Sequence, residues 1–433
     1  MNAMGLREAH AHIPMLGLAL RTLDLSDCVS REECLERLRE RADALSADDP
    51  AGKRWLAARG ARVSAWRDAR WPTRDEIDAI ASGRPAYVMS FDHHALVAGS
   101  AAFRAAGIAD ADPDPPGGVV ERARDGTPTG LLLESAAWKV RVAEPEPQGE
   151  ERARVVLDAL AHLRALGFSE VHDLLSPAWL GPELSRMASA GELPVLVKLY
   201  PALEVFDEVL AGAGAWQRDD VVLAGAKVFV DGTLNARTAW MLEPYADPMP
   251  ERPTGMALLT PAQLDGAIAR TRAARLGLAA HAIGDGAVRA VLDAWERAGP
   301  GKHVWIRPGT PALRIEHAEL VHPADVGRFA GLGVVCSVQP CHLLTDIEVL
   351  ERQLADRLER VLPLRDLMAS GCRPGELLWF GSDVPIVRAN PEDSVRAAVD
   401  RGRAGMARER RIAPRQAISE ADAWRCFERT PPT

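Results

Sequence analysis

Short apolar segments alternate with longer amphipathic segments over the last two thirds of the chain. A helix is predicted over residues 151–166, and it leads into a strand that ends at 171–173. Further apolar runs predict strands at 193–200, 221–230, 277–281, 313–317, 333–338 and 377–383, with a helix at 261–276. Short strands that alternate with helices of about 10–20 residues are typical of βα units around a parallel sheet. With one more strand before His10 the count reaches eight, the number that closes a (β/α)8 barrel.

The segment from residue 30 to residue 149 lacks this rhythm. Residues 30–47 predict a helix, with Ser30 as its N-cap and Glu33 completing a capping box. Tryptophan, proline and glycine then crowd the sequence, and the stretch DADPDPPGG at 110–118 is expected to be a loop. We therefore predict a first barrel strand and loop at 1–29, a mixed insertion at 30–149 and the rest of the barrel at 150–433.

Composition and charge narrow the class of protein. Of the 433 residues, 47% are hydrophobic and 26% are charged, which is typical of a folded globular chain. Lys and Arg number 52 against 61 Asp and Glu, and no basic block stands out, so we expect no nucleic-acid partner. Six cysteines without a CxxC pair do not form a disulfide framework. No apolar run approaches the ~20 residues of a membrane helix, and residues 1–12 lack the apolar core of a signal peptide. We expect a soluble, cytoplasmic protein that does not bind a membrane.

Polar residues at the ends of the predicted strands carry the candidate chemistry. They are the pair His10 and His12, then Lys227, His281, His317 and Asp383. In a (β/α)8 barrel the C-terminal ends of the strands form one mouth, where the active site is built. Residues i and i+2 of a strand point to the same side, so both imidazoles of His10 and His12 can reach one ion. The order of these residues along the chain favours a metal centre.

Each of these side chains also has an ordinary structural interpretation. His10 and His12 could be surface residues near a mobile terminus, and a lone histidine such as His281 or His317 is more often a core residue with satisfied hydrogen bonds. Asp383, in the string FGSDVP, could cap the following turn. It is the conjunction of all five that distinguishes a metal site from these alternatives.

Lys227 lies within the apolar run VVLAGAKVFVD, where a charged amine is costly unless it is paired or neutralised. One interpretation is that it points outward between helices, or pairs with Asp231. The other is that its buried amine reacts with carbon dioxide to give a carbamate, an anionic oxygen donor that can bridge two cations. The residues alone leave both open.

A set of sequence strings resembles one known family. They are REAHAH at 7–12, WPTRDEID at 71–78, FDHHALVAGSAAFRAAGI at 91–108, GTPTGLLLESA at 126–136, KVFVDGTLNARTAWMLEPYAD at 227–247, HAIGDGAVRAVLDAWE at 281–296, RIEHAEL at 314–320, SVQPCH at 337–342 and FGSDVPI at 380–386. In these strings, and in their order, the chain resembles the amidohydrolase superfamily, and within it the YtcJ-like branch that includes N-substituted formamide deformylases.

The resemblance implies a distorted (β/α)8 TIM barrel that holds one or two divalent ions, usually zinc. By position, His10, His12 and Asp383 would hold the more buried ion, His281 and His317 the second, and a carboxylated Lys227 would bridge them. Neutral imidazole and carboxylate are good zinc donors. The implied function is hydrolysis of a C–N bond in an amide-like small molecule by a metal-activated water, with Asp383 as general base.

The resemblance also suggests where the substrate binds. The insertion is expected to cover the barrel mouth, and His93 or His94 would hydrogen-bond the substrate from above, unless it is a buried structural residue. Further pocket candidates, chosen only because they follow predicted barrel strands, are Arg237, Gln339, His342 and Arg388. Trp240 and Tyr245 line the site or, in the simpler interpretation, pack in the core.

Two further expectations concern the ends of the chain and rival functions. Relatives carry a small β-sandwich built from both chain ends, and we expect it to be missing, because HxH occurs at residue 10 and the sequence stops at AWRCFERTPPT. The same site could instead hydrolyse a cyclic amide, an ester or a carbamate, or the barrel could bind metal and ligand without turnover. We also allow for a homodimer.

Overall fold

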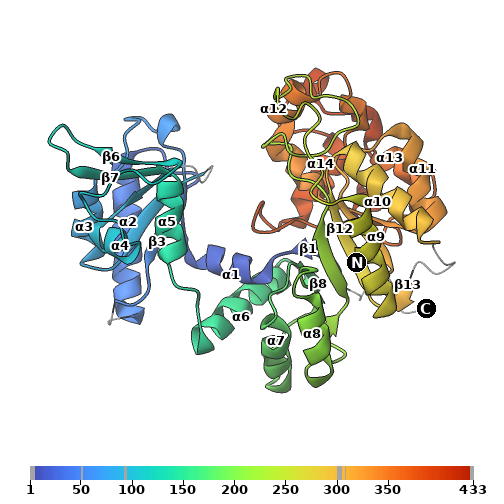
Figure 1. The fold of residues 1–433 in the computed structure, drawn as a ribbon, viewed down its shortest axis with the longest axis horizontal. Helices are drawn as coiled ribbons and strands as arrows, with labels where there is room; N and C mark the ends of the chain where they lie inside the picture. Colours follow the sequence, from blue (N-terminus) through green and yellow to red (C-terminus); the bar gives the residue numbers. More distant parts are fainter. Residues whose placement is uncertain (1–4, 50–51, 92–94, 300–304, 308, 430–433) are drawn as a thin grey trace. The chain divides into compact units, whose positions relative to one another are not determined.

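The computed structural model describes residues 5–49, 52–91, 95–299, 305–307 and 309–429, which fold into two compact units (Figure 1). The large unit takes in residues 1–16 and 156–433, and the small unit is formed by residues 17–155, which follow the first strand. Two helices, α1 (Ile13–Arg21) and α6 (Gly149–Ala165), carry the chain from one unit to the other.

Parallel strands form the centre of the large unit. The first sheet has the order β1 (Leu6–Ala11), β8 (Phe168–Leu174), β9 (Leu196–Tyr200) and β10 (Val221–Leu223). The second sheet has the order β11 (Gly225–Phe229), β12 (Gly277–Ala282), β15 (Leu313–His317), β16 (Val335–Val338) and β17 (Leu378–Phe380). Every residue of β12, β15, β16 and β17 is buried, as expected for parallel strands covered on both faces.

Helices follow the strands of the large unit, so the predicted α/β class with parallel sheets is confirmed. They are α7 (Leu180–Ser189), α8 (Phe206–Gly212), α9 (Pro261–Ala273), α10 (Asp285–Arg297), α11 (Pro323–Leu332), α12 (Leu343–Gln353), α13 (Leu364–Ala369), α14 (Pro391–Asp400) and α15 (Glu420–Arg425). A short antiparallel pair, β13 (Trp305–Arg307) and β14 (Thr310–Pro311), precedes β15. Helix α9 shows why they start where they do: Thr260 caps it, Gln263 completes the capping box and Pro261 occupies the first turn.

Hydrogen bonds also link the two parallel sheets at both of their edges. At one edge Asp383 N–H donates to the carbonyl of His10 (2.7 Å), and His12 N–H donates to the carbonyl of Val384 (2.9 Å). At the other edge Lys227 N–H donates to the carbonyl of Pro201 (2.8 Å). Both links are parallel bridges, Ala11 with Val384 and Ala202 with Lys227.

The structure corrects two local expectations. The apolar run 221–230 is not one strand, because the chain changes partner at Ala224: its N–H donates to Leu199 of β9, whereas its carbonyl accepts from Gly277 of β12. The strand predicted before His10 runs through Ala11, so His10 lies inside it. In both cases the pairing with neighbouring strands decides the boundary, and the apolar pattern does not show it.

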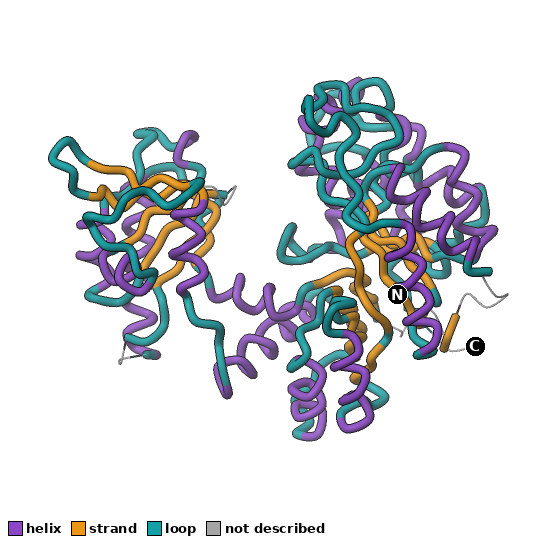
Figure 2. Tube along the Cα trace, viewed as in Figure 1, coloured by secondary structure: helices purple, strands orange, loops and turns teal. Residues whose placement is uncertain are grey.

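The small unit is built on one mixed sheet between helices (Figure 2). Its order is β2 (Leu23–Asp24), β3 (Leu56–Ala61), β4 (Ala86–Ser90), β5 (Ala95–Ala98), β7 (Pro128–Glu134) and β6 (Gly118–Arg122), with β2, β3 and β4 parallel and the rest antiparallel. Its helices are α2 (Arg31–Asp48), α3 (Arg74–Ala81), α4 (Ser100–Ala105) and α5 (Ser135–Ala143).

Strand alternation gives the small unit a core on each face of its sheet. On one face, Ala58 and Val88 pack against Leu35 of α2 and against α3. On the other face, Tyr87 and Met89 pack against α4 and α5. Ser30 caps α2 by accepting the N–H of Glu33, as predicted. The expected capping box differs in one bond: the Glu33 carboxylate accepts from the N–H of Val29 instead of Ser30.

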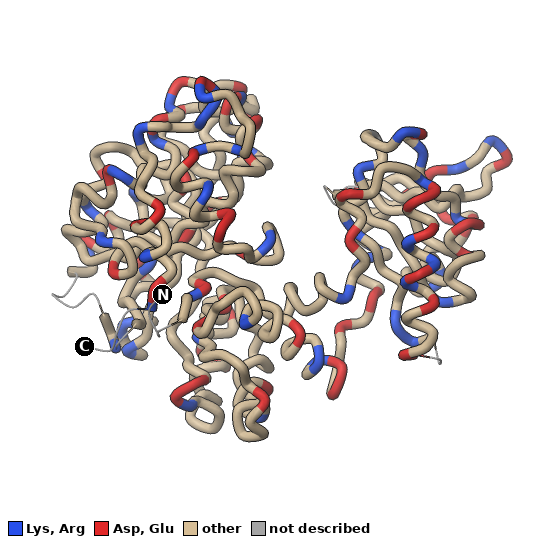
Figure 3. The backbone as a smooth tube through the Cα atoms, turned by 180° about the vertical axis from the view of Figure 1, so that it is seen from behind, with Lys and Arg blue, Asp and Glu red and all other residues tan. Residues whose placement is uncertain are grey.

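Positions of basic and acidic residues are interleaved along the backbone of each unit (Figure 3). Across the described residues, the longer helices are too short or too polar to span a bilayer.

Candidate metal centre

The six predicted metal ligands all lie at strands of the large unit. They are His10 in β1, His12 directly after it, Lys227 in β11, His281 in β12, His317 at the end of β15 and Asp383 shortly after β17. Parallel strands end at the same edge of a sheet, which is where side chains from distant parts of the chain can meet.

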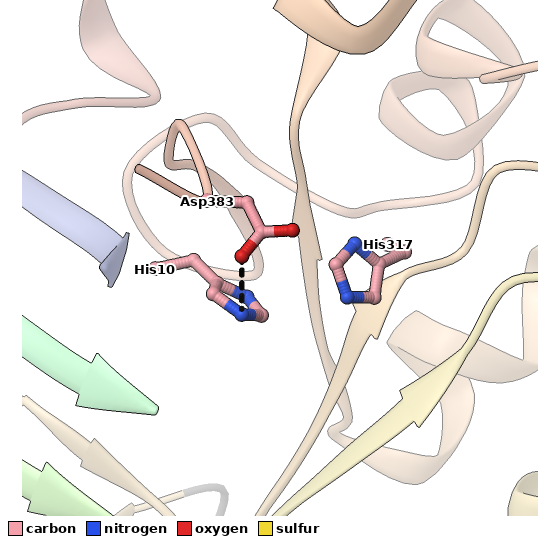
Figure 4. Close-up of side chains that lie close together, drawn as sticks. All are labelled: His10, His317 and Asp383. Carbon is pink, nitrogen blue, oxygen red and sulfur yellow. Dashed lines mark ion pairs between the residues drawn. The ribbon is translucent and has the colours of Figure 1, made fainter. Parts of the chain in front are cut away.

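Four histidines gather around Asp383 and one another. The Asp383 Oδ1 atom lies 2.9 Å from His12 Nε2 and 3.4 Å from His10 Nε2. His10, His317 and Asp383 each offer one ligand atom, and these atoms lie within 4.8 Å of one another. Figure 4 shows the three side chains pointing toward a common centre. The ring of His281 is 4.4 Å from that of His317, centroid to centroid, so it adjoins the same cluster. The structure thus brings together residues that are up to 373 positions apart.

A glycine and a buried carboxylate hold the two ends of the chain together here. A Cβ atom on Gly381 would lie 2.6 Å from the backbone nitrogen of His10, so only glycine lets the segment after β17 approach β1 this closely. Glu8 is fully buried and accepts hydrogen bonds from the N–H of His10 (3.0 Å) and from the N–H and hydroxyl of Ser382 (both 2.9 Å). These contacts position His10 next to Asp383.

Strained backbone conformations also occur within the cluster. His317, Ala318 and Asp383 have φ angles of 72°, 40° and 62°, in the left-handed region that residues with a Cβ rarely adopt. Such conformations cost about 1–3 kcal/mol each and persist where surrounding structure imposes them, most often at functional sites. The strain therefore supports a functional role for both ligand candidates.

Lys227 is buried, with 1% of its surface exposed, so it does not reach solvent between the helices. Its Nζ atom lies 5.2 Å from the ring centroid of Phe229. Burial lowers the pKa of Lys227 to about 8, against the attraction of Glu316 and Asp383. Asp231, the alternative partner, accepts backbone N–H groups of Ile283, Gly284 and Trp240.

The protonation states suit cation binding. Burial lowers the pKa of His281 to about 4 and the pKa values of His10 and His317 well below their ordinary value, so these imidazoles are neutral. Burial alone would raise the pKa of Asp383, but the neighbouring His10 and His12 hold it below its ordinary value. Neutral imidazoles around a carboxylate are the forms that bind a divalent metal.

Two buried nitrogen atoms of the cluster lack hydrogen-bond partners within the described residues, namely His317 Nδ1 and His342 Nε2. A buried polar atom without a partner is costly, and a bound ion or ligand would satisfy it. His342 Nε2 lies 3.8 Å from Asp383 Oδ2, and its Nδ1 is 3.2 Å from Glu319 Oε1. Burial would lower the pKa of His342, but the hydrogen bond and charge of Glu319 raise it to about 9. The donor set therefore fits a divalent cation, with a cationic imidazole beside it.

Sequence reasoning missed two carboxylates at this centre, Glu316 and Glu319. Glu316 Oε2 lies 2.8 Å from His10 Nδ1, and Glu319 Oε1 lies 3.2 Å from His342 Nδ1. A signal for Glu316 was present: Arg314 and Glu316 share one side of the buried strand LRIEH, where an i, i+2 ion pair is unusual. Its partner histidine lies 306 positions away, and no local pattern reveals it.

The remaining predicted pocket residues differ in how near they lie to the cluster. The guanidinium of Arg237 pairs with Asp247, and that of Arg388 pairs with Asp393. Gln339 is buried, with its Nε2 atom 3.4 Å from His10 Nδ1. Tyr245 is buried and donates its hydroxyl to the carbonyl of Ala239 (2.7 Å), whereas Trp240 is only partly buried. His93 and His94 lie outside the described residues.

Comparison with known proteins gives matches along almost the whole chain. The sequence profile of the amidohydrolase family matches residues 4–427. A Bacillus subtilis (strain 168) protein that carries the name amidohydrolase YtcJ is 27% identical over 91% of this chain and 72% of its own length. An N-substituted formamide deformylase of Arthrobacter pascens is 26% identical over 99% of this chain and 78% of its own. The crystal structure of an uncharacterized metal-dependent hydrolase from Pyrococcus horikoshii is 28% identical, with a TM-score of 0.75, over 97% of this chain and 78% of that one.

Proposed function

The chain belongs to the amidohydrolase family, in its YtcJ-like branch, and is a metal-dependent hydrolase; from this premise we propose that it cleaves the C–N bond of an amide-like small molecule. The observation that carries the proposal is the convergence of His10, His12 and His317 on Asp383. The A. pascens relative, a deformylase of N-substituted formamides by name, favours an amide over other carbonyl substrates.

The cluster offers ligands for one or two divalent cations, for which zinc is our expectation because the donors are imidazoles and carboxylates. His10, His12 and Asp383 would hold the first cation, and His281 and His317 the second. When bound, such a cation supplies Lewis acidity, which activates water and polarises a carbonyl oxygen.

Lys227 is the proposed bridge between these two positions. Its burial favours the neutral amine, which can add to carbon dioxide: the Nζ–C bond forms, one proton is released, and a carbamate with two oxygen donors results. A carbamate also removes the cost of a cationic amine among the ligands of two cations.

The proton steps fall to Asp383. Since its carboxylate is ionised and lies next to three histidines, it can take a proton from the attacking water and return it to the leaving nitrogen. We propose that His342, oriented by Glu319, hydrogen-bonds the substrate through Nε2, the atom that is buried without a partner in the described structure. Arg237 would contribute from the loop that follows β11 once a substrate competes with Asp247 for its guanidinium.

We also propose that the two parallel sheets form a single distorted (β/α)8 barrel. If β10 and β11 count as one interrupted strand, the two sheets together supply the eight strands of such a barrel. The hydrogen bonds between His10 and Asp383 at one edge, and between Pro201 and Lys227 at the other, support this closure. Along the chain, the small unit follows the first strand, as the predicted insertion does.

The test combines metal analysis with one substitution. Protein purified without chelator should contain one to two zinc-like ions per chain and should hydrolyse members of an N-substituted formamide and N-acyl amine panel. Asp383→Asn keeps an oxygen ligand but loses the base, so it should retain most of the metal and lose turnover by a factor of about 10²–10⁴. The matched control is Asp393→Asn, which changes a buried aspartate that pairs with Arg388 instead.

Each alternative function has its own outcome in the same assay. Turnover confined to cyclic amides, esters or carbamates would replace the proposed substrate class. Metal binding without hydrolysis of any class would indicate a binding protein. Retained hydrolysis in Asp383→Asn would remove Asp383 from the role of base.

A further inference from the structure

A continuous line of buried hydrogen bonds leads away from the metal centre into the interior of the large unit. It begins at His10, whose Nδ1 lies 2.8 Å from Glu316 Oε2. Arg314 binds both oxygens of Glu316 and places its Nη1 atom 2.7 Å from His172 Nδ1. His172 Nε2 in turn lies 2.8 Å from Glu170 Oε1. All five side chains are 5% exposed or less.

The chemistry of these groups allows only one direction of donation. A guanidinium can only donate, so Arg314 makes acceptors of both Glu316 oxygens and of His172 Nδ1. His172 then carries its proton on Nε2 and donates it to Glu170. At the other end, a carboxylate that accepts from Arg314 can pair with His10 at 2.8 Å only if Nδ1 of His10 carries the proton.

We propose that Glu316, held by Arg314, is a positioning residue that fixes the proton of His10 on Nδ1 and thereby leaves the lone pair of Nε2 for the metal. This inference rests on the proposed metal centre. His10 Nε2 is the nitrogen that faces Asp383, 3.4 Å from Oδ1. A proton held on Nδ1 by Glu316 therefore leaves Nε2 unprotonated on the side of the cluster. A histidine ligand held through its other nitrogen by a carboxylate is both oriented and more basic.

Arg314 also steadies the strand that carries His10. Its Nη2 atom donates to the carbonyl of Ala9 (2.6 Å) and to the hydroxyl of Ser337 (2.9 Å). The nearest competitor for His10 Nδ1 is Gln339, whose Nε2 atom is 3.4 Å away. The carboxylate is closer and charged, so it determines the tautomer.

Glu316→Gln tests this proposal sharply, because glutamine has the shape of glutamate and the proposal predicts in which direction the His10 proton moves. The closer contact of Arg314, from its Nε–H to Oε1, keeps the amide oxygen in the Oε1 position, so the amide NH2 group takes the Oε2 position and faces His10. His10 Nδ1 then has to accept, its proton moves to Nε2, and the metal-binding lone pair is lost. The matched control is Glu170→Gln, the same change at the far end of the line.

Two measurements follow. In metal-free protein labelled with ¹⁵N-histidine, with His10 assigned through His10→Asn, the wild type and Glu170→Gln should carry the proton on Nδ1 and Glu316→Gln on Nε2. Competition with a chromophoric zinc chelator should show zinc affinity lowered about 10–100-fold by Glu316→Gln and changed less than about 3-fold by Glu170→Gln. Thermal unfolding of the metal-free variants shows whether each one is folded.

The double variant Arg314→Leu with Glu316→Leu covers the case in which Glu316→Gln does not fold, since replacing a buried ion pair by apolar residues is often tolerated. It should also bind zinc more weakly than the wild type. The inference is overturned if folded Glu316→Gln keeps the proton on Nδ1 with wild-type zinc affinity, or if Glu170→Gln loses as much affinity. A wild-type chain that binds zinc but cleaves no amide would refute the proposed function and leave these results standing.

Discussion

Two lysines are buried in parallel strands of the large unit, and their amines have different surroundings. The Nζ atom of Lys198 in β9 lies 3.0 Å from Glu170 Oε1 and also donates to the carbonyl of Gly309. The Nζ atom of Lys227 in β11 faces the ring of Phe229. Burial lowers the pKa of both amines, but only for Lys198 does a carboxylate in direct contact counter this effect. Lys198 is thus suited to remain an ammonium, and Lys227 to react as an amine.

Substitution of Lys227 tests whether it becomes a metal ligand. Lys227→Ala should lower the zinc content toward one ion per chain and reduce turnover, because the bridging oxygens are gone. Formate, acetate or propionate should restore part of both, since a short carboxylate can occupy the space of the carbamate. Zinc content by elemental analysis and the rate of amide hydrolysis are the measurements.

Lys198→Met is the control, because it removes a buried lysine that pairs with Glu170 instead of facing the cluster. It should reduce stability without changing the zinc content. If Lys227→Met leaves both metal content and rate at wild-type values, no bridge exists, and a single-metal centre is the better description.

At the scale of elements, the centre depends on how closely the segment after β17 approaches β1. A Cβ atom on Gly381 would meet the His10 nitrogen at 2.6 Å, Glu8 Oε1 at 2.8 Å and the His10 Cβ at 2.9 Å. Two of these three atoms are backbone or Cβ atoms, which cannot turn away as the end of a long side chain can. One methyl group is therefore enough to separate two elements whose side chains would share a cation in the proposed metal centre.

Gly381→Ala should consequently lower the free energy of unfolding by about 1–3 kcal/mol, the usual cost of overpacking, and weaken zinc binding as His10 moves away from Asp383. Gly331→Ala in α11 is the matched control, because its Cβ would contact nothing within 4 Å. That change should be neutral or stabilising, as alanine favours a helix over glycine. Chemical denaturation and zinc competition measure both effects, and equal zinc affinity in the two variants would contradict this account of the centre.

The strands and the clustered histidines could be predicted from the sequence because their signals are local. An apolar run such as 313–317 and the HxH pair are each visible within a few residues. The break at Ala224 and the contact between His10 and Glu316 depend on pairing with remote segments, so the pattern of apolar positions does not contain them. The predicted domain boundaries stay predictions for the same reason.

At the scale of the whole molecule, both units bury their thiols. Cys28 and Cys34 belong to the core of the small unit, and Cys336, Cys341, Cys372 and Cys426 are buried in the large unit. All six are free cysteines, so packing and hydrogen bonds hold each unit together without covalent links. Burial raises the pKa of each thiol, to about 12 for Cys34, Cys341 and Cys372. A buried thiol with a raised pKa is a poor nucleophile.

The native chain should therefore react slowly with Ellman's reagent at pH 8, with less than one thiol modified in the time that a free thiol needs to react completely. Raising the pH to 9 should increase the rate about tenfold but leave the reaction slow, because the thiolate fraction of a group with a pKa near 12 rises tenfold per pH unit and still stays near 0.1%. Complete unfolding in urea should expose all six thiols. Ala211→Cys, on the exposed side of α8, provides a thiol that must react quickly in the folded protein. Rapid modification of a native cysteine at pH 8 would mean that the unit containing it opens far more readily than its buried core allows. The identity of the modified thiol would show which of the two units opens.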